Sequence, residues 1–219
     1  PREVVEEAVD ALEAGARELV LVSQDTASYG KDLGRDGALA ALLEELAGLE
    51  GDFRVRLMYM QPDGVDGDLM RALGHDRICS YLDLPLQHVD GEVLRGMGRR
   101  GGETEYRRLL ADLRERVPGI ALRSSFITGF PGEGRAAFRR LRDFCEEARF
   151  DWLSVFAYSP EEGTRAAGMP GRCAGRTARA RAEELRGLQE EIMRANAESR
   201  VGQAERVLVA PSRNEEVNT

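Results

Sequence analysis

The sequence predicts an α/β protein in which parallel strands alternate with helices. Five short runs are rich in valine, leucine, isoleucine and phenylalanine, as buried strands are. Between them, apolar residues recur at the spacing of a helix face. Strands separated by helices favour βαβ units, and five are too few for a closed eight-stranded barrel. An open or partial barrel, or a doubly wound sheet, is therefore expected.

The individual elements follow from the same patterns, taken in chain order. The predicted strands are residues 18–24, 53–60, 78–86, 120–130 and 151–159, the third being expected to stop near Pro85. The predicted helices are residues 2–16, 37–49, 66–73, 90–98, 103–116, 134–148 and 176–199. A last strand is predicted over residues 205–212, where ERVLVAPS is apolar and β-branched. A lone strand is not stable by itself, so the chain is expected to be a fragment of a longer protein.

Composition and charge limit the classes of function. The 219 residues carry a net charge of −8, which argues against broad electrostatic binding of nucleic acid but leaves room for a local basic patch. Lys31 is the only lysine, and a GC-rich genome is the simplest explanation of so much arginine. No apolar run has the length of a membrane span, and the acidic, helical first residues are unlike a signal peptide. A cytoplasmic location is expected.

The cysteines predict neither a disulfide framework nor a metal site. Cys79, Cys145 and Cys173 are widely spaced, and no two have the spacing of metal ligands. Cys79 falls in a predicted strand and Cys145 on the apolar face of a helix, so both are expected to be buried. Cys173 lies in a glycine-rich loop without an evident partner.

Polar residues follow the predicted strands, at the end where parallel α/β folds bind ligands. They are Ser23 to Thr26, Gln61, Asp83 to His88, Thr128 to Glu133, and Tyr158 to Ser159. The uncharged hydrogen-bonding side chains of Gln24, Gln87 and His88 suit a ribose, an amine or an amide group of a ligand. Alternatively, they cap loops. The carboxylates Asp25, Asp83 and Glu133 suit acid–base work or helix caps. His88 is a candidate general base or metal ligand on weak evidence, and His75 is expected to be structural.

Arg123 is the most informative single residue. It lies inside an otherwise apolar strand, where a guanidinium is costly unless it is paired. Its planar fork suits a carboxylate. From the residues alone, that carboxylate is either one on a ligand or Asp83 in an internal salt bridge.

Four segments, in this order and at these spacings, resemble the radical S-adenosylmethionine (SAM) methylthiotransferases. They are LVSQDTASYGKD, YLDLPLQHVDGEVLRGMGRRGG, LRSSFITGFPGE and FAYSPEEGTRAA. The resemblance extends from residue 1 to about residue 210. One branch of that family modifies an adenosine in tRNA, and the other an aspartate of a ribosomal protein. Gln24-Asp25-Thr26, Leu84 to His88, and Glu161 to Thr164 look like the ribosomal-protein branch.

The resemblance implies a fold and a division into domains. Residues 1–200 would form a partial (β/α)6 radical SAM barrel that lacks its first strand. That strand and the CxxxCxxC loop of the family would come just before Pro1. Residues 201–219 would begin a C-terminal TRAM β-barrel, so that residues 205–212 would be its first strand.

The resemblance also implies an enzyme, a transferase. A 4Fe-4S cluster and SAM would generate a 5′-deoxyadenosyl radical, which abstracts hydrogen from the β-carbon of an aspartate, where a methylthio group is then added. The partners implied are a small-subunit ribosomal protein and SAM, with RNA contact through the TRAM domain. The protein is expected to be a monomer without membrane contact. Because the cluster cysteines are absent from the sequence, this chain alone is expected to be inactive.

Site roles carried over from the family concern SAM. Gln24 would face the methionyl amine, Gln87 the ribose, and Arg123 the methionyl carboxylate. Gly129 and Phe130 would back the adenine, while Phe156 and Tyr158 would line the mouth of the site. The resemblance assigns no catalytic residue and no metal ligand.

Other functions remain as alternatives. A tRNA adenosine methylthiotransferase is the sister branch, and a non-catalytic module with a SAM-shaped pocket belongs to another class. An unrelated barrel hydrolase or aldolase is disfavoured, because the strand ends carry no lysine for a Schiff base and no clear nucleophile or metal set.

Overall fold

The computed structural model describes residues 1–204 and 207–209 and confirms an α/β fold with parallel strands. Each of the five predicted core strands is present. They are β1 (Glu18–Leu21), β2 (Arg54–Leu57), β3 (Tyr81–Gln87), β4 (Ala121–Thr128) and β5 (Trp152–Ala157). The strand predicted over residues 205–212 falls largely outside the described residues, and 207–209 carry no strand.

Every predicted helix is also present. The helices are α1 (Arg2–Glu13), α2 (Ala38–Ala47), α3 (Gly67–Leu73), α4 (Gly91–Gly96), α5 (Glu103–Arg116), α6 (Arg135–Ala148) and α7 (Gly175–Ser199). Short 3-10 turns, η1 (Thr26–Ser28), η2 (Lys31–Leu33), η3 (Pro62–Gly64) and η4 (Arg165–Gly168), lie in the loops. Among the described residues, no helix is both long and apolar enough to cross a bilayer.

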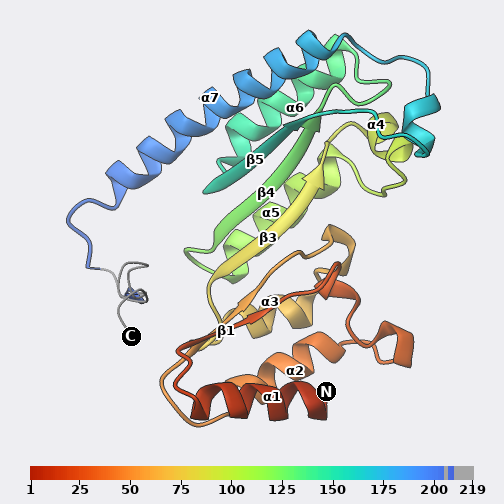
Figure 1. The fold of residues 1–219 in the computed structure, drawn as a ribbon. Coiled ribbons are helices and arrows are strands. Elements are labelled where there is room, and N and C mark those ends of the chain that lie inside the picture. Colours follow the sequence, from red (N-terminus) through yellow and green to blue (C-terminus); the bar gives the residue numbers. More distant parts are fainter. Residues whose placement is uncertain (205–206, 210–219) are drawn as a thin grey trace, which may run out of the picture.

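The strands form two sheets rather than one continuous wall. β1 pairs with β2, and β3, β4 and β5 pair in that order, all in parallel. At the boundary, Val55 bridges to Ile78, and the Met60 amide donates to the Asp83 carbonyl at 2.9 Å. Figure 1 shows the two bodies, with α1, α2 and α3 beside β1 and α5, α6 and α7 beside the larger sheet.

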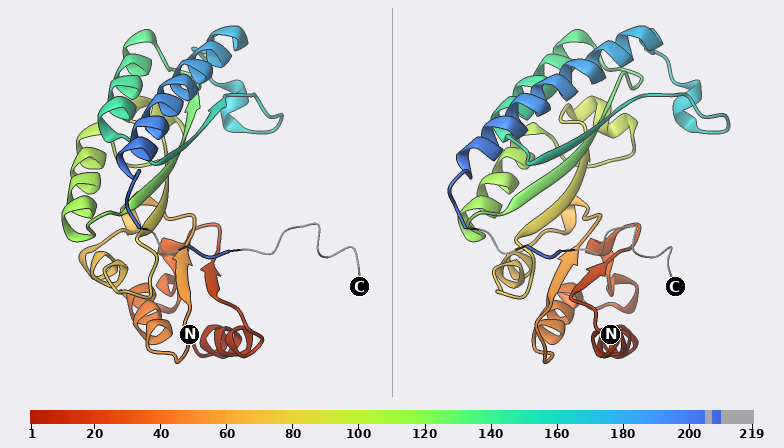
Figure 2. Two further views of the ribbon diagram at one scale, coloured as in Figure 1. Left: turned by 90° about the vertical axis from the view of Figure 1, so that its left-hand side faces the viewer. Right: turned by 60° about the vertical axis from the view of Figure 1, so that its left-hand side comes forward.

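Helices cover one face of each sheet, and the other face is open. In β4, Leu122, Ser124, Phe126 and Thr128 are buried, whereas the residues between them are partly exposed. The buried side holds an aromatic cluster in which Phe126 meets Phe150 edge to face at 5.9 Å. The views in Figure 2 show the helices gathered on one side of β3, β4 and β5. Any ligand of the sheets therefore has access from the uncovered side, which we call the open face.

β3 runs through Pro85 and ends at Gln87, one residue beyond the predicted strand, and it is irregular there. Proline cannot donate to a ladder, and the register with β4 shifts between Leu84 and Gln87. The Ser124 hydroxyl bridges the irregularity, since it donates to the Leu84 carbonyl at 2.7 Å and lies 3.5 Å from the Leu86 amide. The bulge ends at Gln87 with a φ of 66°, an unusual conformation for a residue other than glycine.

Gly129 allows α7 to approach the end of β4. Its φ is 77°, and a Cβ at this position would lie 2.3 Å from the Cβ of Ala178 on α7. Both the backbone conformation and the space therefore require glycine.

We expect Gly129→Ala to lower the free energy of unfolding by about 3 kcal/mol, because it adds overpacking to left-handed strain. Gly98→Ala is the matched control, since Gly98 has a φ of 72° and nothing near its missing Cβ. Strain alone should cost the control about 1 kcal/mol. Urea unfolding of both variants measures the difference. If both variants lose the same free energy of unfolding, the close contact between Gly129 and α7 does not contribute to the effect.

Candidate functional site

A polar chain crosses the open face of the larger sheet. Arg123 on β4 stands beside Asp83 on β3, and its Nη1 lies 2.6 Å from Asp83 Oδ2. Its Nη2 donates to the Ser154 hydroxyl on β5 at 3.3 Å. The internal salt bridge, one of the two partners considered from sequence, is therefore present. Sequence patterns did not identify Ser154, because a small polar residue in a strand is unremarkable.

The pair is asymmetric in its exposure. Asp83 is fully buried, and 27% of the Arg123 side chain is exposed. Burial raises the pKa of Asp83, although Arg123 and the Tyr59 backbone amide oppose that effect. Asp83 Oδ1 has no hydrogen-bond partner among the described residues. The Asp83 carboxylate thus binds the guanidinium on its buried side. The exposed side of the guanidinium can bind an anion that approaches the open face.

A second charged pair lies on the smaller sheet and reaches the larger one. Arg56 on β2 forms an ion pair with Glu18 on β1. The same guanidinium stacks over the Tyr81 ring on β3, 4.9 Å from its centroid. Arg56 therefore links the two sheets by a cation–π contact where their backbone pairing is sparse.

The predicted site residues do not all come together. Arg123 and Phe156 lie in neighbouring strands of the larger sheet, and the Phe156 side chain is exposed. Phe130 is instead buried, and its ring meets that of Tyr158 at 5.2 Å in an edge-to-face contact. Gln24 is exposed in the loop after β1, on the other sheet.

The remaining two predicted residues end strands of the larger sheet. Gln87 is half-buried at the end of β3, and Gly129 follows β4 and is covered by α7. The site residues thus form two groups, one across the open face and one at the carboxyl ends of β3, β4 and β5. Tyr59, with a φ of 55° at the end of β2, was not identified from sequence.

A buried polar cluster lies behind the strand ends. His88 is fully buried, and its Nδ1 accepts from the Asp90 amide at 2.9 Å, which assigns the proton of the neutral ring to Nε2. Nε2 has no hydrogen bond and lies 3.9 Å from Glu133 Oε2. Burial lowers the pKa of His88 to about 4. The imidazole is therefore neutral at pH 7 and does not reach the open face as a general base.

Glu133 ties the turn after β4 to α7. Its carboxylate accepts from the Gly129 amide and from Arg181 of α7, whose Nη1 lies 2.7 Å from Oε1. Burial raises the pKa of Glu133, and these donors oppose it. The contacts fix the conformation of Gly129 and Phe130, so Glu133 is a structural residue of the strand-end group.

The described residues offer no set of metal ligands. Cys145 is buried as predicted, whereas Cys79 and Cys173 are partly exposed, and all three are free. Within residues 1–204 and 207–209, no three His, Cys, Asp or Glu side chains gather as they would around a metal ion.

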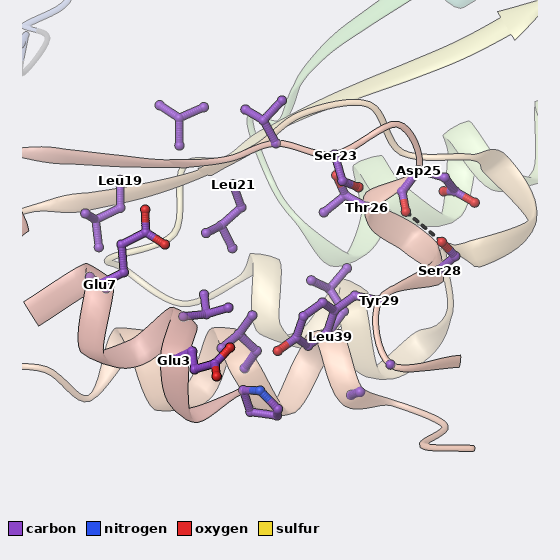
Figure 3. Close-up of a pocket in the computed structure, with 18 of the residues that line it drawn as sticks. Glu3, Glu7, Leu19, Leu21, Ser23, Asp25, Thr26, Ser28, Tyr29 and Leu39 are labelled. Carbon is purple, nitrogen blue, oxygen red and sulfur yellow. Dashed lines mark hydrogen bonds between the residues drawn. The ribbon is translucent and has the colours of Figure 1, made fainter. Parts of the chain in front are cut away.

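A cleft of about 750 Å³ opens between α1, α2 and the unpaired edge of β1. Figure 3 shows Leu19, Leu21 and Leu39 on its apolar walls and Tyr29 beside them. Asp25 Oδ1 and the Tyr29 hydroxyl are buried here without a partner in the described part of the chain. Burial raises the pKa of Tyr29. An apolar cleft with unsatisfied polar atoms at a free strand edge can accept further polypeptide.

Known proteins resemble this chain in sequence. Residues 1–145 match the family described as the Radical SAM superfamily. The ribosomal protein uS12 methylthiotransferase RimO of Geotalea uraniireducens (strain Rf4) is 44% identical over 94% of this chain and 46% of its own length. That of Roseiflexus sp. (strain RS-1) is 47% identical over 94% of this chain and 44% of its own length. The chain thus spans slightly less than half the length of these relatives.

Solved structures resemble it in fold. The radical S-adenosylmethionine methyltransferase TsrM of Kitasatospora setae has a TM-score of 0.56 at 17% identity, over 70% of this chain and 30% of that one. Coproporphyrinogen III oxidase HemN of Escherichia coli, described as a radical SAM enzyme, has a TM-score of 0.54 at 17% identity, over 91% of this chain and 44% of that one.

The buried His88 predicts a pH dependence of stability. Between pH 6.5 and about 4, the unfolded chain binds a proton at His88 that the folded chain does not, so acidification favours unfolding. Over that range, wild type should lose about 3 kcal/mol relative to His88→Asn, whose amide oxygen replaces the Nδ1 acceptor.

Urea unfolding at several pH values measures this difference. His75→Asn is the control, because His75 is exposed and its Nδ1 also accepts from the amide two residues later. Parallel pH profiles for wild type and His88→Asn would refute a buried, neutral His88.

Proposed function

The chain belongs to the radical SAM superfamily, and on that premise we propose that it is the central part of a methylthiotransferase acting on a ribosomal protein. The product would carry a methylthio group on the β-carbon of an aspartate in a small-subunit ribosomal protein. The observation that carries this proposal is the 44–47% identity, over 94% of this chain, to proteins named uS12 methylthiotransferases. That stretch is long enough to include both sheets of the open face.

The donors on the open face suit SAM. Arg123 offers a guanidinium, and Gln87 and Gln24 offer amides, a set that matches the carboxylate, ribose and amine of that molecule. When bound, SAM supplies the methyl group and the source of the radical. We assign the methionyl carboxylate to Arg123, the ribose to Gln87 and the amine to Gln24.

Apolar and backbone groups at the strand ends suit the remaining part of SAM. Gly129 and Phe130 are assigned to the adenine, with Phe156 and Tyr158 at the mouth of the site. The Phe130–Tyr158 edge-to-face contact gives this wall a fixed shape. Exposed Phe156 extends the apolar surface from the wall onto the open face.

The cysteines of the described residues do not fit a 4Fe-4S cluster, because all three are free and no ligand set gathers. We therefore assign the cluster ligands to another part of the longer protein. The proposed division is residues 1–200 for the radical SAM core and 201–219 for the start of a TRAM domain. RNA contact through that domain, a monomeric state and a cytoplasmic location complete the proposal.

The cleft beside β1 supports a strand supplied by the longer protein. The Arg17 and Leu21 carbonyls accept hydrogen bonds from β2 and from Met58 just after it. Alternation along the strand therefore directs the Val20 amide to the unpaired edge. A parallel strand there would complete the barrel wall against the apolar side of α1.

Hydrogen exchange tests that strand. The Val20 amide should exchange at least tenfold more slowly in a protein of the relatives' full length than in the 219-residue chain, because it gains an acceptor. The Val55 amide, already bonded to the Arg77 carbonyl at 2.8 Å, is the internal control. Equal exchange of Val20 in both proteins would exclude the added strand.

Arg123 is the residue whose replacement tests the SAM site. In the longer protein, Arg123→Gln should weaken SAM binding by about ten- to a hundredfold, because a hydrogen bond between charged groups is lost. Arg123→Lys keeps the charge without the fork and should be intermediate. Arg116→Gln is the control, since it removes an exposed arginine from the last turn of α5, outside the proposed site. Isothermal titration measures the affinities, and unchanged binding in Arg123→Gln would remove Arg123 from the site.

Activity is tested by mass spectrometry of the two candidate substrates after incubation with the cluster-loaded longer protein, SAM, a one-electron reductant and inorganic sulfide as the sulfur source. A methylthio group in place of a hydrogen on the aspartate of the ribosomal protein is expected. The same group on a tRNA adenosine would transfer the assignment to the sister branch. No product on either substrate would favour a non-catalytic module.

A further inference from the structure

The segments around the starts of α6 and α7 are rich in arginine and touch each other. Residues 129–140 and 171–181 contain seven arginines and one glutamate, in a chain whose net charge is −8. The Gly132 amide donates to the Gly171 carbonyl at 3.1 Å, so the two segments are in contact. Figure 1 shows α6 and α7 side by side and beginning at the same end.

Most of these arginines have no internal partner. Arg140 pairs with Asp90 and Arg181 with Glu133. The other five are exposed, and their side chains make no ion pair or hydrogen bond with the described residues. They are Arg135, Arg139, Arg172, Arg176 and Arg179, and we call them the arginine surface.

Their positions are unfavourable for stability. Cations are destabilising in the first turn of a helix, where the helix dipole is positive. Arg135 begins α6, and Arg176 lies in the first turn of α7 with Arg179 just after it, yet neither helix has an acidic residue in its first turn. Two parallel helices bring their positive ends together here. The fold gains nothing from this concentration of charge, which points to an external anion.

The surroundings indicate which class of anion. The large exposed apolar side chains of the described residues lie elsewhere: Val20, Val22, Tyr59, Trp152, Phe156, Val201 and 207–209. A protein interface usually has an apolar centre, and a membrane-binding surface presents apolar side chains beside its cations. A group of exposed arginines that has neither an apolar centre nor exposed apolar neighbours suits the phosphodiester backbone of nucleic acid.

We propose that the arginine surface binds the phosphate backbone of RNA. It lies at the turn where β4 ends, so bound RNA would border the carboxyl-end rim of the sheet. The choice of RNA over DNA rests on the proposed function, because a ribosomal protein is surrounded by RNA. The charge argument for a phosphate backbone is independent of that function.

Fluorescence anisotropy with a labelled RNA hairpin tests the proposal in the 219-residue chain, without SAM or cluster. The variant R172Q/R176Q/R179Q should bind at least tenfold more weakly at about 0.1 M salt. The slope of log affinity against log salt should fall by about two, since each lost phosphate contact removes about 0.7–0.9. Its thermal midpoint should not fall, because charges opposed by the helix dipole are removed.

The matched control is R71Q/R116Q/R194Q, which removes the same charge at exposed arginines away from this surface. It should bind the hairpin within about twofold of wild type. Equal weakening of both variants, or no binding by wild type, would overturn the proposal. Displacement of the RNA by an oligoglutamate peptide at equal charge concentration would also overturn it, in favour of an acidic protein partner. These outcomes do not depend on methylthiotransferase activity.

Discussion

The contact on which the site depends is the ion pair between buried Asp83 and partly exposed Arg123. A guanidinium placed in the middle of a sheet needs a carboxylate, and a buried carboxylate needs a cation. The parallel register puts the two side by side, 2.6 Å apart. Removing either would leave the other uncompensated in a region of low dielectric. The pair therefore fixes the direction in which Arg123 faces the open side, and Ser154 limits its rotation.

The same pair also lies at the boundary between the two sheets. The Asp83 carbonyl accepts from the Met60 amide, and the Tyr59 amide stabilises the Asp83 carboxylate. The Tyr59 backbone adopts a strained left-handed conformation at this point. The contacts that Tyr59 and Met60 make with Asp83 hold the backbone in that conformation. One residue of β3 thus joins a charge of β4 to the backbone that follows β2.

Much of the fold was predictable from sequence, and the reasons for the exceptions are physical. Periodicity located every helix and core strand, because each buries one face. It placed the end of β3 near Pro85 but did not reveal the bulge there, where Ser124, forty residues from Leu84, hydrogen-bonds to the backbone. Arg123 was recognisable because a charge inside an apolar strand needs a partner. His88 was ambiguous, as burial and a hydrogen bond from the Asp90 amide are set only by the tertiary structure.

A ligand-binding role of the open face explains why it carries a charged residue and large exposed aromatic rings, which do not stabilise the fold. Exposed Phe156 and Trp152 lie on β5 beside a strand that carries Arg123. On the covered face of β4, by contrast, the polar residues are Ser124 and Thr128, which are uncharged and hydrogen-bonded. A sheet that needed only to be stable would place neither a charge nor large exposed rings on its open face. A ligand that combines a carboxylate with an apolar ring system would satisfy both kinds of group at once. The chemistry of the face thus restricts its ligand more strongly than the fold does, because unrelated functions share α/β folds.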